Sequence, residues 1–340
     1  MLLERLTILL LCSAGATQAA PLYALTQAIP IGAPDRWDLL TFDPGSDRVY
    51  IAHGDRVTVV DVQAGKVIGS VEGFPGGTHG VAVIPALHRG YTDDGKAATA
   101  NSFDLATLKT LKSLPAADDA DAIAFDRVTG NLFVIDSDPG KITVIDPKTD
   151  AVLTTLEGGG KLEIAAADGL GKVYVNGEEK REILRIDART LTIDARWPIP
   201  ACESPHGIAV DNRGHHVFSS CANKLMVVLS TQDGKQLASL PIGARTDGVA
   251  FDPNTHRAFS SNGDGTLTVV GEKTPGNFVV LDTVQTSLGA RTMTIDPRSG
   301  RLFLVAADLT ENAGVDPSDY RHRYTVTPGS AKLLIYDPAP

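Results

Sequence analysis

Several features that assign proteins to large functional classes are missing from this sequence of 340 residues. After residue 20 no apolar run is long enough to cross a bilayer, so we expect no membrane span. Basic residues do not offset the acidic ones, because 31 Lys and Arg stand against 41 Asp and Glu, which gives a net charge of -10. Such a surface repels phosphate backbones, and nucleic acid is therefore not an expected partner.

Familiar catalytic signatures are missing as well. The chain has no Gly-x-Ser-x-Gly nucleophile elbow, no phosphate-binding loop and no dinucleotide fingerprint. The cofactor is unknown, and a divalent metal ion is the one that the residues described below favour. Whether the protein is an enzyme stays open at this stage, and its catalytic residues are unknown.

Cysteine is scarce, with three residues in the chain. The first lies in an N-terminal segment with a short apolar run, residues 6–11, followed by small residues up to Ala20. This pattern is typical of a secretory signal peptide, so we predict that residues 1–20 are removed and that the protein is periplasmic or secreted. Cys202 and Cys221 then remain. Two cysteines in an exported chain favour a disulfide, and a catalytic or metal-binding thiol is the alternative.

The sequence does contain a phrase that occurs seven times. A small, apolar, β-prone run ends in an acidic or turn residue, and a second β-prone run follows; we call the last residue of the first run the anchor. The anchors are Asp43, Ile84, Asp126, Asp168, Asp211, Asp252 and Asp296. Steps of 41 to 44 residues in a β-rich chain are typical of a propeller with one blade per repeat.

We therefore predict an all-β fold, a seven-bladed β-propeller of four-stranded antiparallel blades, formed as a single domain by residues 21–340 and expected to be a monomer. The residue two before each anchor is always small, and the residue just before the anchor is bulky in six of seven copies. These two positions point to opposite faces of a strand, so small faces meeting large faces would let adjacent blades interlock. The acidic anchors themselves are interpreted as turn formers.

Closure of the ring can also be predicted. The last repeat ends after its third strand, residues 332–337, and lacks a fourth. The segment 23–32 ends in Ile-Pro-Ile-Gly, which resembles Leu-Pro-Ile-Gly at 240–243, and we expect it to pair with the C-terminal repeat. The segment 308–330 is much longer than the matching loops of other repeats. It is interpreted either as a lid over the channel mouth or as a disordered decoration.

One repeated position carries ionisable side chains throughout. Five residues before each anchor, where the first strand begins, stand Asp38, His79, Asp121, Glu163, His206, Asp247 and Arg291. First strands line the central axis of a propeller, so we expect these seven residues, the mouth ring, to surround one end of the channel and to bind a ligand. Residues that end second strands, such as Asp93 and Asp136, arrive at the same end.

Four carboxylates in one ring repel one another, and histidines, Arg291 or a bound cation would relieve that repulsion. Mixed carboxylate and imidazole ligands suit Ca²⁺, Mn²⁺ or Zn²⁺, and the candidate metal ligands are His79, Asp121, Glu163 and His206. A histidine could instead serve as a general base. The alternative is structural: strand-entry carboxylates often accept hydrogen bonds from turn amides, and polar channels hold water.

The pattern resembles the YVTN/YncE-type family of exported β-propellers. The stretches that carry the resemblance are residues 79–83, 163–176, 201–205 and 261–269, and it extends over the whole mature chain. The Gly-His and Trp-Asp pairs of tryptophan–aspartate repeats do not recur with the period, since Gly-His occurs once, at 214–215, and Trp-Asp once, at 37–38. The resemblance implies a seven-bladed ring and export, and it implies no single activity, because members look like binding or scaffold proteins.

Three hypotheses about function follow. The first is a binding module that presents its acidic, histidine-lined mouth to a small ligand, a metal or a protein partner at one ring face. The second is a metal-assisted hydrolase or lyase, lactonase-like, in which Arg291 would clamp an anion. The third is a purely structural envelope component.

Overall fold

The computed structural model describes residues 20–316 and 319–339, so the predicted signal peptide lies outside the described residues except for Ala20. The described chain forms seven four-stranded antiparallel sheets, together with one two-stranded sheet. The seven-bladed all-β propeller is thus confirmed.

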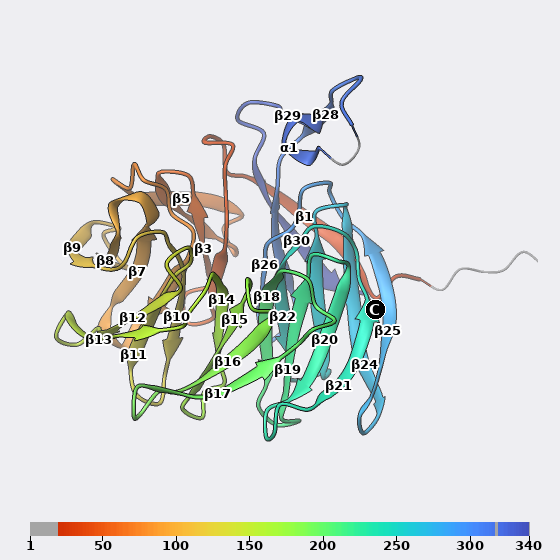
Figure 1. The fold of residues 1–340 in the computed structure, drawn as a ribbon. Helices are drawn as coiled ribbons and strands as arrows, with labels where there is room; N and C mark the ends of the chain where they lie inside the picture. Colours follow the sequence, from red (N-terminus) through yellow and green to blue (C-terminus); the bar gives the residue numbers. More distant parts are fainter. Residues whose placement is uncertain (1–19, 317–318, 340) are drawn as a thin grey trace, which may run out of the picture.

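In the first six blades, four strands that are consecutive in sequence lie side by side, with the first strand nearest the centre (Figure 1). The strands of blades 1 to 3 are β2 (Leu40–Asp43), β3 (Arg48–His53), β4 (Arg56–Asp61), β5 (Lys66–Glu72), β6 (Val81–Ile84), β7 (Arg89–Asp94), β8 (Thr99–Asp104), β9 (Thr110–Pro115), β10 (Ala120–Asp126), β11 (Asn131–Asp136), β12 (Lys141–Asp146) and β13 (Ala151–Glu157). Two short 3₁₀ turns, η1 (Pro85–Leu87) and η2 (Gly95–Ala97), lie in blade 2.

Blades 4 to 6 repeat the same order. Their strands are β14 (Leu162–Ala167), β15 (Lys172–Gly177), β16 (Glu182–Asp187), β17 (Thr192–Pro198), β18 (Pro205–Asp211), β19 (His216–Cys221), β20 (Leu225–Ser230), β21 (Gln236–Pro241), β22 (Thr246–Asp252), β23 (Arg257–Asn262), β24 (Thr266–Thr274) and β25 (Asn277–Gln285).

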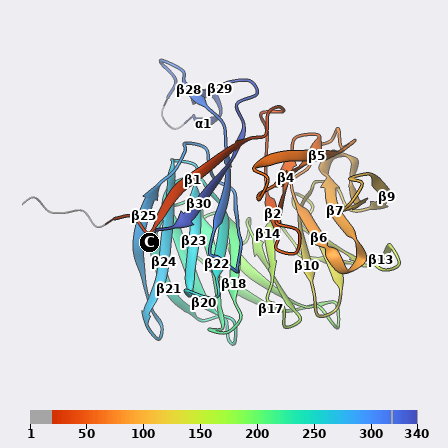
Figure 2. The same ribbon diagram turned by 180° about the vertical axis from the view of Figure 1, so that it is seen from behind.

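Blade 7 is built from both ends of the chain. It contains β26 (Met293–Ile295), β27 (Leu302–Ala306), β30 (Lys332–Pro338) and, as its outer strand, β1 (Tyr23–Pro30). The N-terminal strand runs antiparallel to β30, with Ile29 opposite Leu333, and Figure 2 shows the two strands side by side. The predicted closure is confirmed, and β30 is paired on both sides, with β27 and with β1.

The hydrophobic core lies between blades. Seven clusters of buried side chains fill the seven junctions, one for each pair of neighbouring blades. Each second strand contributes one buried aromatic residue to this core, and these are Tyr50, Tyr91, Phe133, Tyr174, Phe218, Phe259 and Phe303.

The aromatic residues explain why the position two before each anchor is small. In every blade that position pairs directly with the aromatic residue across the two strands, as Ala124 does with Phe133 and Thr41 with Tyr50. The aromatic ring can then reach the bulky residue of the next blade: Phe303 stacks on Phe42 at 4.9 Å between ring centroids. Large and small side chains interlock across the junction in this way.

The acidic anchors form turns. The Asp126 carboxylate, for example, accepts hydrogen bonds from the backbone N–H of Thr129 at 3.0 Å and from its hydroxyl at 2.7 Å. In all seven blades the turn closes on a residue with positive φ, at positions 47, 88, 130, 171, 215, 256 and 300. These carboxylates are therefore occupied by their own turns.

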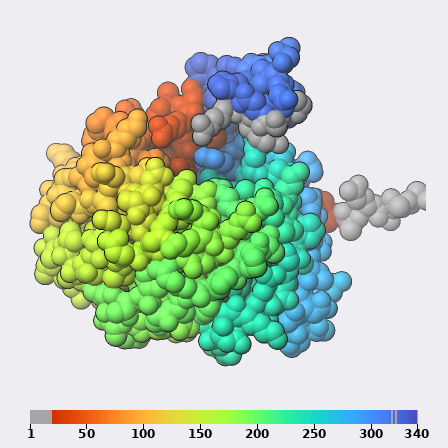
Figure 3. All heavy atoms as spheres, viewed as in Figure 1, coloured from red at the N-terminus to blue at the C-terminus, as the bar shows by residue number. Residues whose placement is uncertain are grey.

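The long segment 308–330 of blade 7, which we call the excursion, is folded where the structure describes it. It holds β28 (Leu309–Glu311) paired with β29 (Tyr324–Val326) and the short helix α1 (Tyr320–Arg323). Figure 3 shows that it projects beyond the body of the ring. The backbone N–H of Gly329 donates to Asp35 at 2.9 Å, and the Arg245 guanidinium lies over the Tyr324 ring at 6.0 Å. These contacts attach the excursion to the rim of blades 1 and 6.

Candidate functional site

The mouth ring assembles at one end of the channel. A cavity of about 160 Å³ is lined by six of its seven members, Asp38, Asp121, Glu163, His206, Asp247 and Arg291. His79 stands beside them, with its Nδ1 atom 3.8 Å from Oδ1 of Asp121. Residues that lie far apart in the sequence therefore share one small, highly charged cavity.

The start of the first strand aims these side chains. In four blades the ladder between the first and second strands shifts register at the ring residue, which places Asp121, Glu163, His206 and Asp247 in or beside a bulge. A bulge leaves an extra residue unpaired and redirects its side chain. Two residues before the mouth-ring residue, the backbone has positive φ in five blades, at positions 77, 119, 204, 245 and 289. The bulged strand entry is thus part of the repeat.

His79 is held by a buried carboxylate. Asp93 is fully buried at the end of β7, accepts hydrogen bonds from the backbone N–H of His79 and of Gly80, and lies 3.0 Å from Nδ1 of His79. Burial by itself would lower the pKa of His79, but Asp93, Asp121 and Asp38 together raise it to about 9. Sequence reasoning placed Asp93 at this end of the ring and did not identify it as the partner of His79.

One part of the mouth has the spacing of a metal site. Asp38, His79 and Asp121 each offer a ligand atom, and these atoms all lie within 4.8 Å of one another. Burial raises the pKa of Asp121 to about 7, and burial together with Asp247 raises that of Asp38. Carboxylate oxygens and an imidazole nitrogen oriented by Asp93 form a suitable donor set for a divalent ion, which would displace the proton of His79 on binding. The donor set fits such an ion.

Glu163 and His206, the other two predicted metal ligands, form a neighbouring pair. Nδ1 of His206 lies 3.6 Å from Oε1 of Glu163, and Nε2 lies 3.5 Å from the Ser204 hydroxyl. That hydroxyl donates to Glu178, which in turn pairs with Lys161 at 2.9 Å. Burial raises the pKa of Glu163. Ser204, Glu178 and Lys161 recur in no other blade, so the period could not identify them.

The remaining charges balance each other at the rim. Nε of Arg291 lies 3.2 Å from Asp247, and this carboxylate is the main reason why the pKa of Arg291 is raised. One guanidinium therefore faces one of the four carboxylates of the cavity. The carboxylates of Asp38 and Asp121 lie close to His79, Asp38 also interacts with Arg291, and Glu163 lies close to His206.

Other strand-end residues have structural partners. His53 contacts the Thr58 hydroxyl at 2.8 Å, Asp136 accepts from the Thr143 hydroxyl at 2.8 Å, and Asn262 donates to the Thr268 hydroxyl at 3.1 Å. Each of these hydrogen bonds stays inside one blade. They support the mouth without lining its cavity.

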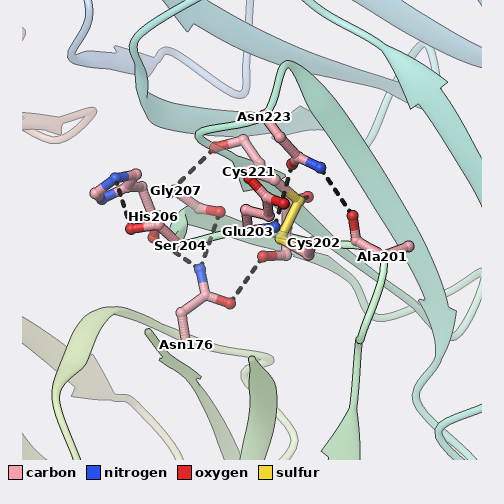
Figure 4. The surroundings of a disulfide bond; sticks show 11 residues. Asn176, Ala201, Cys202, Glu203, Ser204, His206, Gly207, Cys221 and Asn223 are labelled. Carbon is pink, nitrogen blue, oxygen red and sulfur yellow. Dashed lines mark hydrogen bonds between the residues drawn. A yellow bond between two sulfur atoms is a disulfide. The ribbon is translucent and has the colours of Figure 1, made fainter. Parts of the chain in front are cut away.

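The two cysteines meet beside the mouth. Cys202 and Cys221 are joined by a disulfide, with their Cα atoms 5.2 Å apart (Figure 4). The bond ties the loop before β18 to the end of β19, next to Ser204 and His206. Asn176 of the neighbouring blade donates to the backbone carbonyl of His206 at 2.7 Å. The disulfide and this inter-blade hydrogen bond together hold the His206 strand entry in place.

Comparison with known proteins supports the fold alone. No family model and no curated protein sequence matches the chain. Among solved structures, 1770 chains match, and one belongs to the crystal structure of the mitotic checkpoint complex. It shares 13% sequence identity, and the match covers 98% of this chain and 99% of that chain with a TM-score of 0.73. So low an identity shows the propeller architecture, and the resemblance to the YVTN/YncE-type family stays a prediction.

Helices in the described part of the chain are short. None of its helices has the length and apolar character needed to span a membrane.

Proposed function

We propose that this propeller is an exported binding protein whose acidic mouth holds a small cationic ligand, either a divalent metal ion or an ammonium group. The observation that carries the proposal is the cavity of about 160 Å³ that collects Asp38, Asp121, Glu163 and Asp247 around one axis. A volume of this size admits an ion or one small charged group, whereas drug-sized ligands need several hundred Å³.

Electrostatics favours a cation over a neutral ligand. Burial makes ionised carboxylates costly, and it raises the pKa of Asp121 to about 7. A cation in the cavity would stabilise the ionised carboxylates that burial disfavours. Export fits the same protein, because a disulfide between Cys202 and Cys221 persists in an oxidising compartment.

The test is calorimetric titration of chelator-treated protein with Ca²⁺, Mn²⁺, Zn²⁺ and methylammonium. We expect at least one cation to bind with 1:1 stoichiometry and Asp121→Asn to weaken that binding at least tenfold. Glu157→Gln is the matched control, because it removes one carboxylate from the exposed outer strand of the same blade. If no cation binds, or if both variants bind as well as the wild type, the acidic mouth is not a cation site.

A second function, metal-assisted hydrolysis, is favoured by one specific observation. The Asp93 carboxylate orients His79 beside Asp38 and Asp121, as outer-sphere carboxylates do for metal-bound imidazoles. A metal held there would act as a Lewis acid on an ester or lactone carbonyl. Glu163 and His206, 3.6 Å apart across the same cavity, would supply a base. The four predicted residues would then divide between the two roles, with His79 and Asp121 as metal ligands and Glu163 and His206 as the base.

Substrate turnover distinguishes metal-assisted hydrolysis from simple cation binding. A panel of lactones and esters is incubated with metal-loaded protein, with and without chelator, and with the variants Asp121→Asn and Glu157→Gln. Hydrolysis that chelator and Asp121→Asn abolish, and that Glu157→Gln retains, supports the enzyme. Cation binding without turnover would support the binding function and contradict the enzyme.

A further inference from the structure

The channel has a second, larger opening at its opposite end. Mouth-ring residues stand at the start of the first strands, and a small cavity of about 130 Å³ lies among mid-strand residues such as Ile123 and Ile208. A third cavity, of about 560 Å³, is lined by residues at the other ends of the same strands, among them Phe125, Val210 and Phe251. It is more than three times the volume of the acidic mouth and falls in the range of small-molecule sites.

Blade 4 creates this cavity by departing from the repeat. The residue before the anchor is bulky in six blades, and in blade 4 it is Ala167, which lines the cavity. The residue after the anchor is Gly169, and the turn closes one position early, at Gly171, whereas the other six blades close at the fourth residue after the anchor. Two small side chains and a shortened turn together leave the space that a bulky residue fills elsewhere.

Gly169 also makes room for a guanidinium. A Cβ atom at this position would lie 2.5 Å from a terminal nitrogen of Arg127, and φ is +68°. Any larger residue would therefore be strained and would displace Arg127. The arginine can lie across blade 4 only because the turn contains glycine.

The lining combines aromatic walls with positive charge. Phe125 and Phe251 are only partly buried, and Arg127 and Arg213 are exposed. The carboxylate of Asp168, also in the lining, already accepts hydrogen bonds from the backbone N–H groups of Leu170 at 2.7 Å and Lys172 at 3.0 Å. Two arginines thus line a cavity whose one carboxylate is engaged through Oδ1 by its own turn.

We propose that this opening, the basic mouth, is a second binding site that takes a small planar organic acid. Phenyl rings offer flat apolar surface to an aromatic body, and guanidinium groups bind a carboxylate with parallel hydrogen bonds. The two ends of the channel then have opposite charge preference: carboxylates at the acidic mouth select cations, and arginines at the basic mouth select anions. The site does not depend on what the acidic mouth binds.

The experiment is calorimetric titration of the full mature chain with 2-naphthoate, the neutral analogue 2-naphthalenemethanol and the non-aromatic acid cyclohexanecarboxylate. We expect 2-naphthoate to bind 1:1 and at least tenfold more tightly than either analogue. Ala167→Phe, which restores the bulky residue of other repeats, should abolish binding, and Arg213→Gln should weaken it about tenfold, the size of one lost charge-assisted hydrogen bond.

Control variants keep the test specific. Arg181→Gln removes an exposed arginine of blade 4 that does not line this cavity, and Asp121→Asn changes the acidic mouth; both should bind 2-naphthoate like the wild type. If Ala167→Phe does not fold, Ala167→Val and Arg213→Gln are used instead. Valine is suitable at position 167 because Val210 already occupies the matching position of blade 5. Absence of binding at 10 mM, equal binding of either analogue, or no effect of the cavity variants would overturn the proposal.

Discussion

At the scale of single residues, the surroundings of a carboxylate decide its chemistry. Asp187 lies on the surface, accepts hydrogen bonds from Lys172 at 2.7 Å and from two turn amides, and has a lowered pKa mainly because of that lysine. Burial at the mouth instead raises the pKa of Asp121 to about 7. Residues of one type therefore differ in charge at neutral pH according to solvation and partners.

Asp136 provides a pH-dependent prediction away from the cavity. Burial raises its pKa to about 6, although Thr143, the Ala117 amide and Lys141 act in the opposite direction. Because the folded-state pKa lies above the unfolded value, the folded state is favoured when this group is protonated, and that stability is lost as pH rises through about 6. Moving a carboxyl pKa from about 4 to about 6 corresponds to about 3 kcal/mol.

The measurement compares urea unfolding at pH 5 and pH 7.5 for the wild type and Asp136→Asn. We expect the wild type to lose about 1.4 kcal/mol more over this interval than the variant, because the other half of the effect falls below pH 5 and groups elsewhere titrate in both proteins. Identical pH dependence in the two proteins would show that Asp136 is not held in its protonated form.

At the scale of secondary structure elements, each blade depends on one cross-strand pair. The aromatic residue of the second strand stands opposite a small residue of the first, as Phe259 stands opposite Ala250. Phe259 is fully buried and meets Tyr23 of β1 edge to face, with 5.2 Å between ring centroids. The same pair therefore packs its own blade and contacts the next one.

Truncation of this aromatic residue should be costly. Phe259→Ala removes a fully buried ring from the junction of blades 6 and 7, and we expect the free energy of unfolding to fall by about 3–5 kcal/mol. Leu281→Ala on the outer strand of blade 6 is the control, since that side chain is 39% exposed. It should change stability by less than about 1 kcal/mol. Urea unfolding followed by fluorescence measures both, and equal losses would contradict the prediction.

At the scale of the whole molecule, the ring is closed by one strand from the far end of the chain. Tyr23, Ile29 and Ile31 are buried at the junctions of blade 7, and β1 covers the edge of β30. An uncovered β30 would expose a row of unpaired backbone groups and invite association between chains.

Removal of β1 should therefore open the ring. A chain that begins at residue 32 loses three buried side chains, each worth roughly 1.5–3 kcal/mol, and should unfold at a markedly lower temperature and aggregate. A synthetic peptide of residues 21–32 should restore much of the loss by adding back the strand. Replacing residues 309–326 by a short Gly-Ser loop is the control, because this excursion lies outside the ring. Equal thermal stability of the two shortened chains would argue against the closure.

Much of the fold could be predicted because a period survives in the sequence. Seven anchors, seven small residues and seven ionisable strand entries predicted the number of blades and the membership of the mouth ring, and the incomplete last repeat predicted the closing strand. The repeated residues reflect short-range packing, because every blade must fit its own strands and its two neighbours in the same way. A departure such as Ala167 is visible in the sequence as an exception, but its consequence depends on the side chains that surround it.

What only the tertiary structure decided is how the charged groups at the acidic mouth pair with one another. His79 takes Asp93 from its own blade, Arg291 takes Asp247 from the neighbouring blade, and His206 lies between Glu163 and Ser204. Distances across the axis depend on bulges, on the small residues of blade 4 and on the curvature of the ring. Short-range sequence patterns record the demands of one strand and its neighbours, whereas the electrostatics of a cavity arises from all seven blades together.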